Sequence, residues 1–475
     1  MRVGLRSTIE LSATELATTE DTVDAEVQSY SLAPPCPRRP LWWRVSNRIA
    51  GPSTDPLVRI AHMGSALAAS NLARGGIQFV TSLVIARGLG RSGFGAWMLA
   101  AAAASGLTVA FDLGFGVLLT REAARGADQI GRLVADALAT RFILFLPIGL
   151  LAYSGLFTSW TGAVQHDTLH AVVLLAASGL AYATLAPACR AAPQPLVAIL
   201  GIETTGAMLQ CGGAAVLVAR GAGIPALLHL ATAVLIAQSA AALVVWRRIA
   251  ALDRFAAPSA RSAWNALRRA VPFAFAGLIA NAQARLGPLF LGMVAGTGEV
   301  ASFGVATRLA GVALRLPSSA FGAALPVLSQ EAQRGQAAPA HARFAGALRW
   351  FAIGAAAVLI VGASPIVRFA YGPEFAAAAT PLVLAGLGLL PTLVNSGRKV
   401  YLNASGREHA ALRWSAATFV VQIAACLLLI PRYGAAGAMA GLALGEAAIW
   451  LPLRMEEADR FASKSLRPSR CLRSS

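Results

Sequence analysis

The chain has 475 residues, of which 56% are hydrophobic and 13% are charged, and its formal net charge is +18. A soluble domain carries about 25% charged residues, so this composition excludes an ordinary soluble protein. The five cysteines are scattered, which excludes a disulfide framework and a cysteine metal site.

Residues 1–62 differ in composition from the rest of the chain. Acidic residues are followed by a proline cluster, and no apolar core follows a basic start, so this stretch is not a signal peptide. We predict a disordered cytoplasmic tail. A second interpretation is that translation begins at Met63, just before the first apolar segment.

Apolar runs of about twenty residues recur along the remaining chain, as in an all-α polytopic membrane protein. The sequence predicts about twelve transmembrane helices. The predicted spans are 66–87, 94–117, 134–157, 168–188, 196–219, 224–246, 271–296, 300–328, 345–369, 376–397, 410–430 and 435–454.

Basic residues are unevenly distributed between alternate connections, which sets the orientation in the membrane. Arginines and one lysine crowd the connections on the side of the N-terminus, whereas few lie on the other side. The crowded side carries Arg121, Arg125, Arg132, Arg190, Arg247, Arg248, Arg254, Arg261, Arg268, Arg269, Arg334, Arg343, Arg398, Lys399 and Arg407. The positive-inside rule therefore predicts that both termini are cytoplasmic.

The longest internal connection divides the segments into two halves. It covers residues 247–270 and is predicted to be a cytoplasmic linker between a lobe at 63–246 and a lobe at 271–455, with a basic tail at 456–475. Similar Gly-rich turns follow the first segment of each half, which indicates parallel repeats with a substrate site between them.

Arginines lie deep within several predicted spans. Each would cost about 2.5–3.5 kcal/mol if it faced lipid, so we expect them to face a wet cavity that accepts an anionic substrate. Helical spacing places amides on the same stripes as the arginines. The predicted cavity residues are Arg74, Arg285, Arg308, Arg315, Asn71, Gln78 and Asn281. The alternative is that these arginines snorkel or form structural ion pairs.

Three acidic residues also lie within the predicted spans. Asp112, Glu203 and Glu446 are candidates for ion coupling, because an intramembrane carboxylate can carry a proton or bind sodium. Asp112 lies near a helix end, so capping or packing is an equal alternative. Arg141 lies near the cytoplasmic end of its helix, where we expect it to snorkel.

Several fragments, in order along residues 66–455, resemble the polysaccharide flippase (Wzx-type) family, which shares a superfamily with multidrug and toxic-compound extruders and lipid II flippases. The fragments are Ala86–Gly90 with Phe94-Gly95, Asp112-Leu113-Gly114, Phe303–Leu309, Leu316-Pro317, Leu325–Ser329, Tyr371–Phe375 and Ile430–Ala438. The resemblance implies two lobes of about six helices each, in an extruder-like fold. It also implies export of undecaprenyl-pyrophosphate-linked oligosaccharides. Family members often carry an acidic residue shortly after the basic residue of the seventh segment, where this chain has Arg285-Leu286-Gly287-Pro288.

The sequence lacks the signatures of several other functions. No Gly-Lys-Ser/Thr occurs, so no nucleotide-binding loop is predicted. The pair His166 and His170 has ligand-like spacing but no evident third ligand, so no metal site and no cofactor are predicted. No external connection is long enough for a catalytic domain, so we expect a non-enzyme.

The most consistent interpretation is a flippase of the bacterial inner membrane that moves lipid-linked oligosaccharides for surface polysaccharides such as lipopolysaccharide O-antigen or exopolysaccharide. The expected partners are this substrate, membrane lipid and the polysaccharide polymerase and chain-length machinery, with no nucleic acid. The alternatives are an exporter of small drugs or other lipids, a membrane glycan polymerase or ligase, and a scaffold without transport activity.

Overall fold

The computed structural model describes residues 56–124, 130–154, 166–190, 193–249, 258–333 and 337–465. The predicted N-terminal tail up to residue 55 and the last ten residues of the predicted C-terminal tail lie outside these ranges. Over the described residues the chain forms helices and no strands, which confirms the predicted all-α class.

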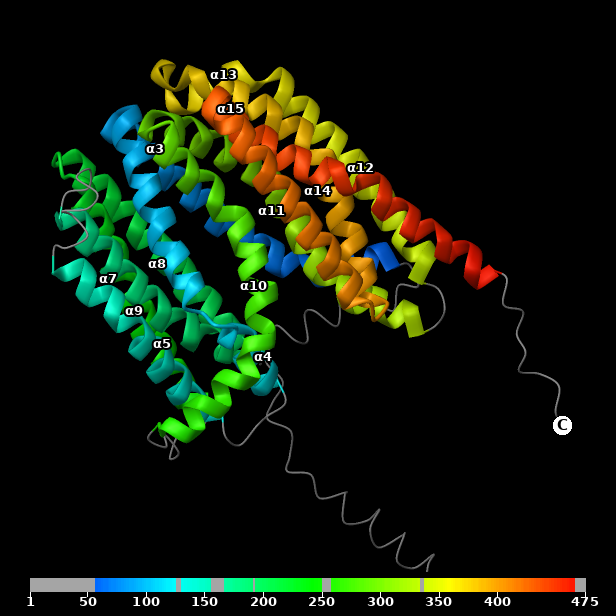
Figure 1. The fold of residues 1–475 in the computed structure, drawn as a ribbon, viewed down its shortest axis with the longest axis horizontal. Coiled ribbons are helices and arrows are strands. Elements are labelled where there is room, and N and C mark those ends of the chain that lie inside the picture. Colours follow the sequence, from blue (N-terminus) through cyan, green and yellow to red (C-terminus); the bar gives the residue numbers. More distant parts are fainter. Residues whose placement is uncertain are drawn as a thin grey trace, which may run out of the picture. The chain divides into compact units, whose positions relative to one another are not determined.

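In the described part of its first half, the chain forms six α-helices. In order these are α3 Pro56–Ala110, α4 Phe115–Ala124, α5 Ile130–Tyr153, α7 His166–Arg190, α8 Pro193–Ala219 and α9 Ile224–Ile249. In Figure 1, α5, α7 and α9 lie side by side, and α8 packs on both α3 and α9.

The second half is also helical in its described part. Its elements are α10 Ala260–Val294, α11 Thr297–Gln333, α12 Ala337–Val361, α13 Ala363–Tyr371, the 3-10 helix η1 Pro373–Ala378, α14 Ala379–Ala404 and α15 Glu408–Ser465. Helices α12, α14 and α15 form a neighbouring group, coloured yellow to red in Figure 1.

Nine helical stretches in the described part of the chain are long and apolar enough to cross a membrane. Two of them, Asn71–Ala110 and Glu408–Met455, are 40 and 48 residues long. Each contains one glycine with non-helical backbone, Gly90 at φ 67° and Gly434 at φ 53°. The multi-pass architecture is therefore confirmed, whereas the number of about twelve helices stays a prediction.

Several element boundaries differ from the sequence-based ones. The capping box of Ser259 and Ser262 starts α10 at Ala260, so the second half of the predicted linker 247–270 is helix. The predicted span 345–369 is divided at Gly362 between α12 and α13. Helix α15 continues to Ser465, into the predicted tail.

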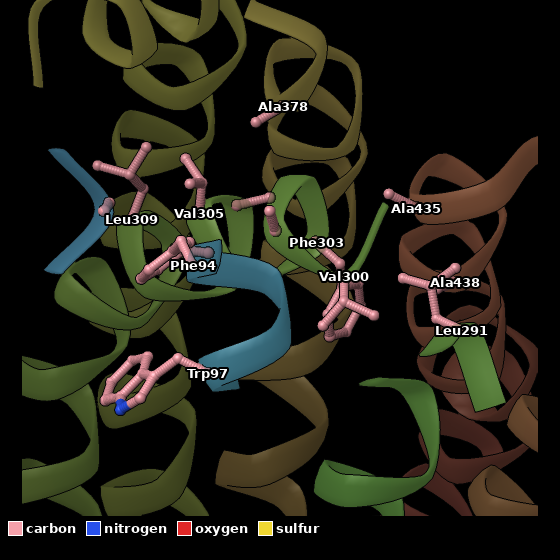
Figure 2. Packing of buried hydrophobic residues seen from close by; sticks show 14 of the residues in the cluster. Phe94, Trp97, Leu291, Val300, Phe303, Val305, Leu309, Ala378, Ala435 and Ala438 are labelled. Carbon is pink, nitrogen blue, oxygen red and sulfur yellow. The ribbon is translucent and has the colours of Figure 1, made fainter. Parts of the chain in front are cut away.

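The largest hydrophobic cluster joins the two halves. Figure 2 shows Phe94 and Trp97 of α3 beside residues of α11, with Leu291 of α10 and Ala435 of α15 in the same cluster. Helix α3 packs extensively on α11. Since lipid tails are as apolar as the helices, this packing depends on close approach at small residues rather than on escape from water.

Gly95 is the closest of these approaches. A Cβ atom at this position would overlap the backbone carbonyl of Thr297, the first residue of α11. The predicted Gly-rich turn after the seventh segment contains Gly296 at φ 83°, a left-handed conformation that glycine adopts without strain.

Candidate substrate cavity

A cavity of about 480 Å³ opens between the helices of the first half and α10. Its volume lies within the range of pockets for small ligands. The wall is made mostly of small and apolar residues, with polar side chains from α3, α7, α8, α9 and α10. The polar and charged lining residues are Arg74, Gln78, Ser105, Thr108, Tyr182, Glu203, Gln210, Gln238 and Arg285.

Arg74 lies at the centre of a polar group in this cavity. Its guanidinium forms an ion pair with Glu203, and its Nη2 donates to Asn71 Oδ1 at 3.1 Å. Asn71 in turn donates to Ser319 Oγ of α11 at 3.3 Å. Arg74 is therefore held by groups from α3 and α8 and, through Asn71, is connected to α11.

Glu203 is a buried carboxylate, with 7% of the residue exposed. Besides the ion pair with Arg74, its Oε1 accepts a hydrogen bond from the Tyr182 hydroxyl at 3.0 Å. Burying a charge is costly unless it is paired and hydrogen-bonded, and both conditions hold here. Small neighbours leave room for these side chains: a Cβ on Gly206 would overlap the amide of Gln238.

Arg285 reaches the same cavity from α10. Its Nε is buried and has no hydrogen-bond partner among the described residues. A buried donor without a partner costs about 1–3 kcal/mol, more for a charged group. Arg285 therefore keeps an unsatisfied hydrogen-bond donor at the cavity wall. The side chain of the predicted cavity residue Asn281 lies outside the described side chains.

Arg308 and Arg315 of α11 lie beside the cavity and do not line it. The Arg308 guanidinium lies over the Trp97 ring at 5.4 Å, and its Nη2 is 3.4 Å from Met98 Sδ. Arg315 Nη2 donates to Gln78 Oε1 at 3.3 Å. Both therefore touch residues of α3 that form the cavity wall.

Asp112 lies outside the cavity. Its carboxylate forms an ion pair with Arg141, which also donates to the Asp112 carbonyl at 3.0 Å and to Thr184. Arg141 is 0% exposed. The expectation that Arg141 snorkels is therefore wrong, because the carboxylate and the backbone carbonyl of Asp112 satisfy it inside the helix bundle.

Glu446 also lies outside the cavity, in a polar group between α14 and α15. Its Oε2 accepts from Asn395 Nδ2 at 2.9 Å, and its Oε1 lies 3.4 Å from Lys399 Nζ. Arg398 donates to the Trp450 carbonyl at 3.0 Å and stacks over the Trp450 ring. The three predicted carboxylates therefore occupy three separate environments.

Several polar residues of the cavity wall, among them Tyr182 and Gln238, were not identified from the sequence. Tyr182 and Gln238 line the wall, and Gln238 Nε2 donates to the Ile202 carbonyl at 3.3 Å. The available signal was a lone amide in an otherwise apolar span, Gln238 in α9. The pairing of Tyr182 with Glu203 depends on the packing of α7 and α8, which sequence patterns do not specify.

A second polar cluster joins the predicted external turns, and we call it the Arg91–Glu299 latch. Arg91 donates from Nε to the Gly298 carbonyl and from Nη2 to Glu299 Oε1, both at 3.2 Å. Glu299 Oε2 accepts the backbone N–H of Ala435 at 2.8 Å, just after the break at Gly434. The latch therefore connects the turns of α3 and α15 through the start of α11.

The helices and the cavity together have the architecture of a known class of membrane transporters. An inward-facing multidrug resistance MATE family transporter of the MOP superfamily matches 87% of this chain and 100% of its own, with 13% identity and a TM-score of 0.64. The lipid II flippase MurJ, inward closed, matches over 82% and 86%, with 14% identity and a TM-score of 0.66. A mutant of a Vibrio cholerae MATE transporter matches over 86% and 97%, with 16% identity and a TM-score of 0.56. At these identities the similarity establishes the fold, which is the predicted extruder-like fold.

The family is established by sequence. The model of the polysaccharide biosynthesis protein family matches residues 62–331, more than half of the chain. The chain therefore belongs to the polysaccharide biosynthesis protein family, as the resemblance in the sequence analysis indicated. No curated protein matches the chain in sequence.

Proposed function

We propose that this protein moves undecaprenyl-pyrophosphate-linked oligosaccharides across the bacterial inner membrane for surface polysaccharide synthesis. The observation that supports this proposal best is the cavity, which combines Arg74 and Arg285 with hydroxyl and amide side chains between apolar helices. Each sugar hydroxyl costs about 4–8 kcal/mol to move unpaired into hydrocarbon, and a pyrophosphate costs far more. A polar, cationic cavity compensates both costs.

The arginines would bind the pyrophosphate. Arg285 carries an Nε donor that has no partner among the described residues, and a guanidinium binds phosphate oxygens in pairs. Gln78, Gln210, Gln238 and Tyr182 would bind the sugars next to it. Arg308 and Arg315, with Asn71 and Asn281, would surround this site as the lobes tilt during alternating access.

The flippase MurJ and the MATE transporters among the similar structures support a transport role for this fold, with lipid-linked substrate and membrane lipid as partners. The proposed activity involves no covalent chemistry and no cofactor. A polymerase and chain-length proteins are proposed partners, because the exported units must be joined. We place the protein in the inner membrane with both termini cytoplasmic.

A second candidate function is the export of small drugs, which the similarity to MATE transporters favours. Drug cargo is usually cationic, and the two arginines of the cavity disfavour it. Efflux of a cationic dye by the purified protein in vesicles would support this alternative.

Arg285→Ala tests the proposed function in a strain from which this gene has been deleted. Surface polysaccharide should fall at least about tenfold, since a charged hydrogen bond contributes about 1.5–3 kcal/mol. Arg285→Lys should restore part of the export, because it restores the charge without the planar fork. Immunoblots of glycan and protein provide the measurement.

The control is Arg220→Ala, which removes an exposed arginine of the turn between α8 and α9. It should export normally. Full export by Arg285→Ala at normal abundance would contradict the proposed role of the cavity.

A further inference from the structure

The ion pair inside the cavity has a specific consequence for an anionic cargo. In this structure Arg74 is paired with Glu203, a residue that is 7% exposed, and Glu203 also accepts the Tyr182 hydroxyl at 3.0 Å. A phosphate that binds the Nη1 group of Arg74 would therefore replace the Glu203 carboxylate. Glu203 occupies the position that an anionic oxygen of the cargo would take.

Charge counting indicates what happens to the displaced carboxylate. The charged residues that line the cavity in the described part of the chain are Arg74, Arg285 and Glu203. Two positive charges and one negative charge leave one net positive charge in the empty site. A pyrophosphate diester carries two negative charges, so the loaded site is neutral only if Glu203 is protonated.

We propose that Glu203 stands in for the cargo phosphate in the empty cavity, and that cargo binding displaces it from Arg74 with uptake of one proton. The proposal rests on the proposed function. The proton comes from the bulk solvent and binds the displaced carboxylate. The Arg74 guanidinium exchanges one anionic oxygen for another, and no covalent bond other than this O–H bond is formed.

Glu203 is the one carboxylate among the described residues that line this cavity. Helix α8 packs against α3, α7 and α9. The groups that contact Glu203 include Arg74 from α3 and Tyr182 from α7, and Arg285 lines the cavity from α10. Helix α9 contributes the neutral Gln238. No histidine lines the cavity in the described residues, and arginine and tyrosine have ordinary pKa values above about 10.

A displaced Glu203 that stayed ionised would be energetically unfavourable, which supports proton uptake. A Glu203 that loses Arg74 and remains ionised would be a buried charge without its cation, beside a new dianion. Breaking a buried ion pair is strongly unfavourable when the remaining charge is left uncompensated. A protonated Glu203 avoids this cost.

The experiment measures binding of citronellyl-diphospho-N-acetylglucosamine to the purified full chain in nanodiscs. Both phosphates of this diester stay ionised between about pH 5.5 and about pH 8, so the probe itself does not titrate. If one proton is taken up on binding, affinity should fall by up to about tenfold for each unit of rising pH. An affinity that does not change with pH would overturn the inference and leave the proposed function intact.

Variants test whether the dependence of affinity on pH comes from the Glu203 carboxylate. Glu203→Gln mimics the protonated acid, so its affinity should match that of the parent at low pH and be constant with pH. Glu203→Asp keeps a carboxylate, so its affinity should change with pH as that of the parent does. The control Glu408→Gln, which removes an exposed carboxylate at the start of α15, should behave like the parent. If the affinity of Glu203→Gln changed with pH as much as that of the parent, the inference would be wrong.

A different result of the same experiment would contradict the proposed function itself. If the folded parent binds the probe at no pH, the cavity is not a pyrophosphate site, and both the proposed function and the inference are wrong. Thermal unfolding of every variant checks that the fold is present, and the slope of the parent and of Glu203→Asp tests the inference even if Glu203→Gln does not fold.

Discussion

At the scale of single residues, glycines decide how closely helices and side chains approach one another. Gly75 lies against the Arg315 guanidinium, which a Cβ atom would overlap. Gly95 lies against the Thr297 carbonyl, so the halves of the molecule meet at backbone distance. Such contacts are typical of membrane helices, where small residues at the interface replace the hydrophobic driving force.

Gly95→Ala should therefore destabilise the protein, whereas Gly76→Ala should not. Overpacking of a tight interface costs about 1–3 kcal/mol, and here the obstacle is backbone that cannot rotate away. A Cβ on Gly76 has no neighbour within 4 Å, and alanine is favoured over glycine in helices by about 1 kcal/mol. Thermal unfolding in detergent measures both variants. Equal midpoints for Gly95→Ala and the parent would contradict the argument.

The buried arginines divide into two kinds at this scale. Arg141 is fully enclosed and paired with Asp112, so it ties α5 to the region after α3. Arg285 has an Nε without a partner among the described residues and lines the cavity. Arg141 is satisfied by the protein itself, whereas Arg285 keeps an unsatisfied donor at the cavity wall.

At the scale of elements, two long helices are interrupted by glycines, and the latch lies at both interruptions. Gly90 precedes Arg91, and Gly434 precedes Ala435, whose N–H binds Glu299. The start of the helix after Gly434 has free backbone donors, which a carboxylate satisfies. Arg87 adds bonds to the Phe369 and Ala370 carbonyls at 3.0 and 3.1 Å.

Glu299→Ala should weaken closure at the predicted external end. It removes both the partner of Arg91 and the cap of the second part of α15. The measurement is labelling of a cysteine placed at Gln78 by a membrane-impermeant thiol reagent added outside, in a chain without its native cysteines. Labelling should become several-fold faster than in the parent.

Asp167→Asn is the matched control for this experiment. It removes an exposed carboxylate from the first turn of α7, away from the latch, and should label like the parent. Unchanged labelling of Glu299→Ala would mean that apolar packing at Phe94, Tyr371 and Phe375 holds this end closed by itself.

At the scale of the whole molecule, the two halves pack mainly through α3 and α11, while α10 packs on α3, α5 and α15. The cavity lies almost entirely in the first half, and α10 supplies Arg285 from the second. A change in the angle between the halves therefore alters the distance between Arg285 and Arg74. Under the proposed function, alternating access would use this change in distance to bind and release one anion.

Alkaline phosphatase fusions test the predicted orientation, because the enzyme is active only outside the cytoplasm. Fusions after residues 92, 162, 298 and 372 should be active, and fusions after residues 128, 258, 336 and 404 should be inactive. The expected pattern follows from the excess of arginine in alternate connections. An active fusion after residue 258 would overturn the predicted orientation, because that connection carries the largest group of arginines.

The helical membrane architecture was predictable from the sequence because apolar length and periodicity are local properties. The same holds for Arg74 and Arg285, whose position inside apolar spans predicted a polar environment. The breaks at Gly90 and Gly434 lie in Gly-containing turns between predicted spans. The boundaries of α10 and α12 were less accurate, since capping at Ser259 and the break at Gly362 are local details that hydropathy does not encode.

The sequence by itself determined that this protein crosses the membrane repeatedly and places arginines within its helices, because hydrocarbon excludes unsatisfied backbone and charge. Only the tertiary structure decided which basic side chain each of the three carboxylates faces. Asp112 pairs with Arg141, Glu203 with Arg74 and Glu446 with Lys399, over separations along the chain that helical periodicity does not relate. The physical reason is that a helix fixes the face on which a side chain lies, whereas helix packing selects the neighbour opposite that face.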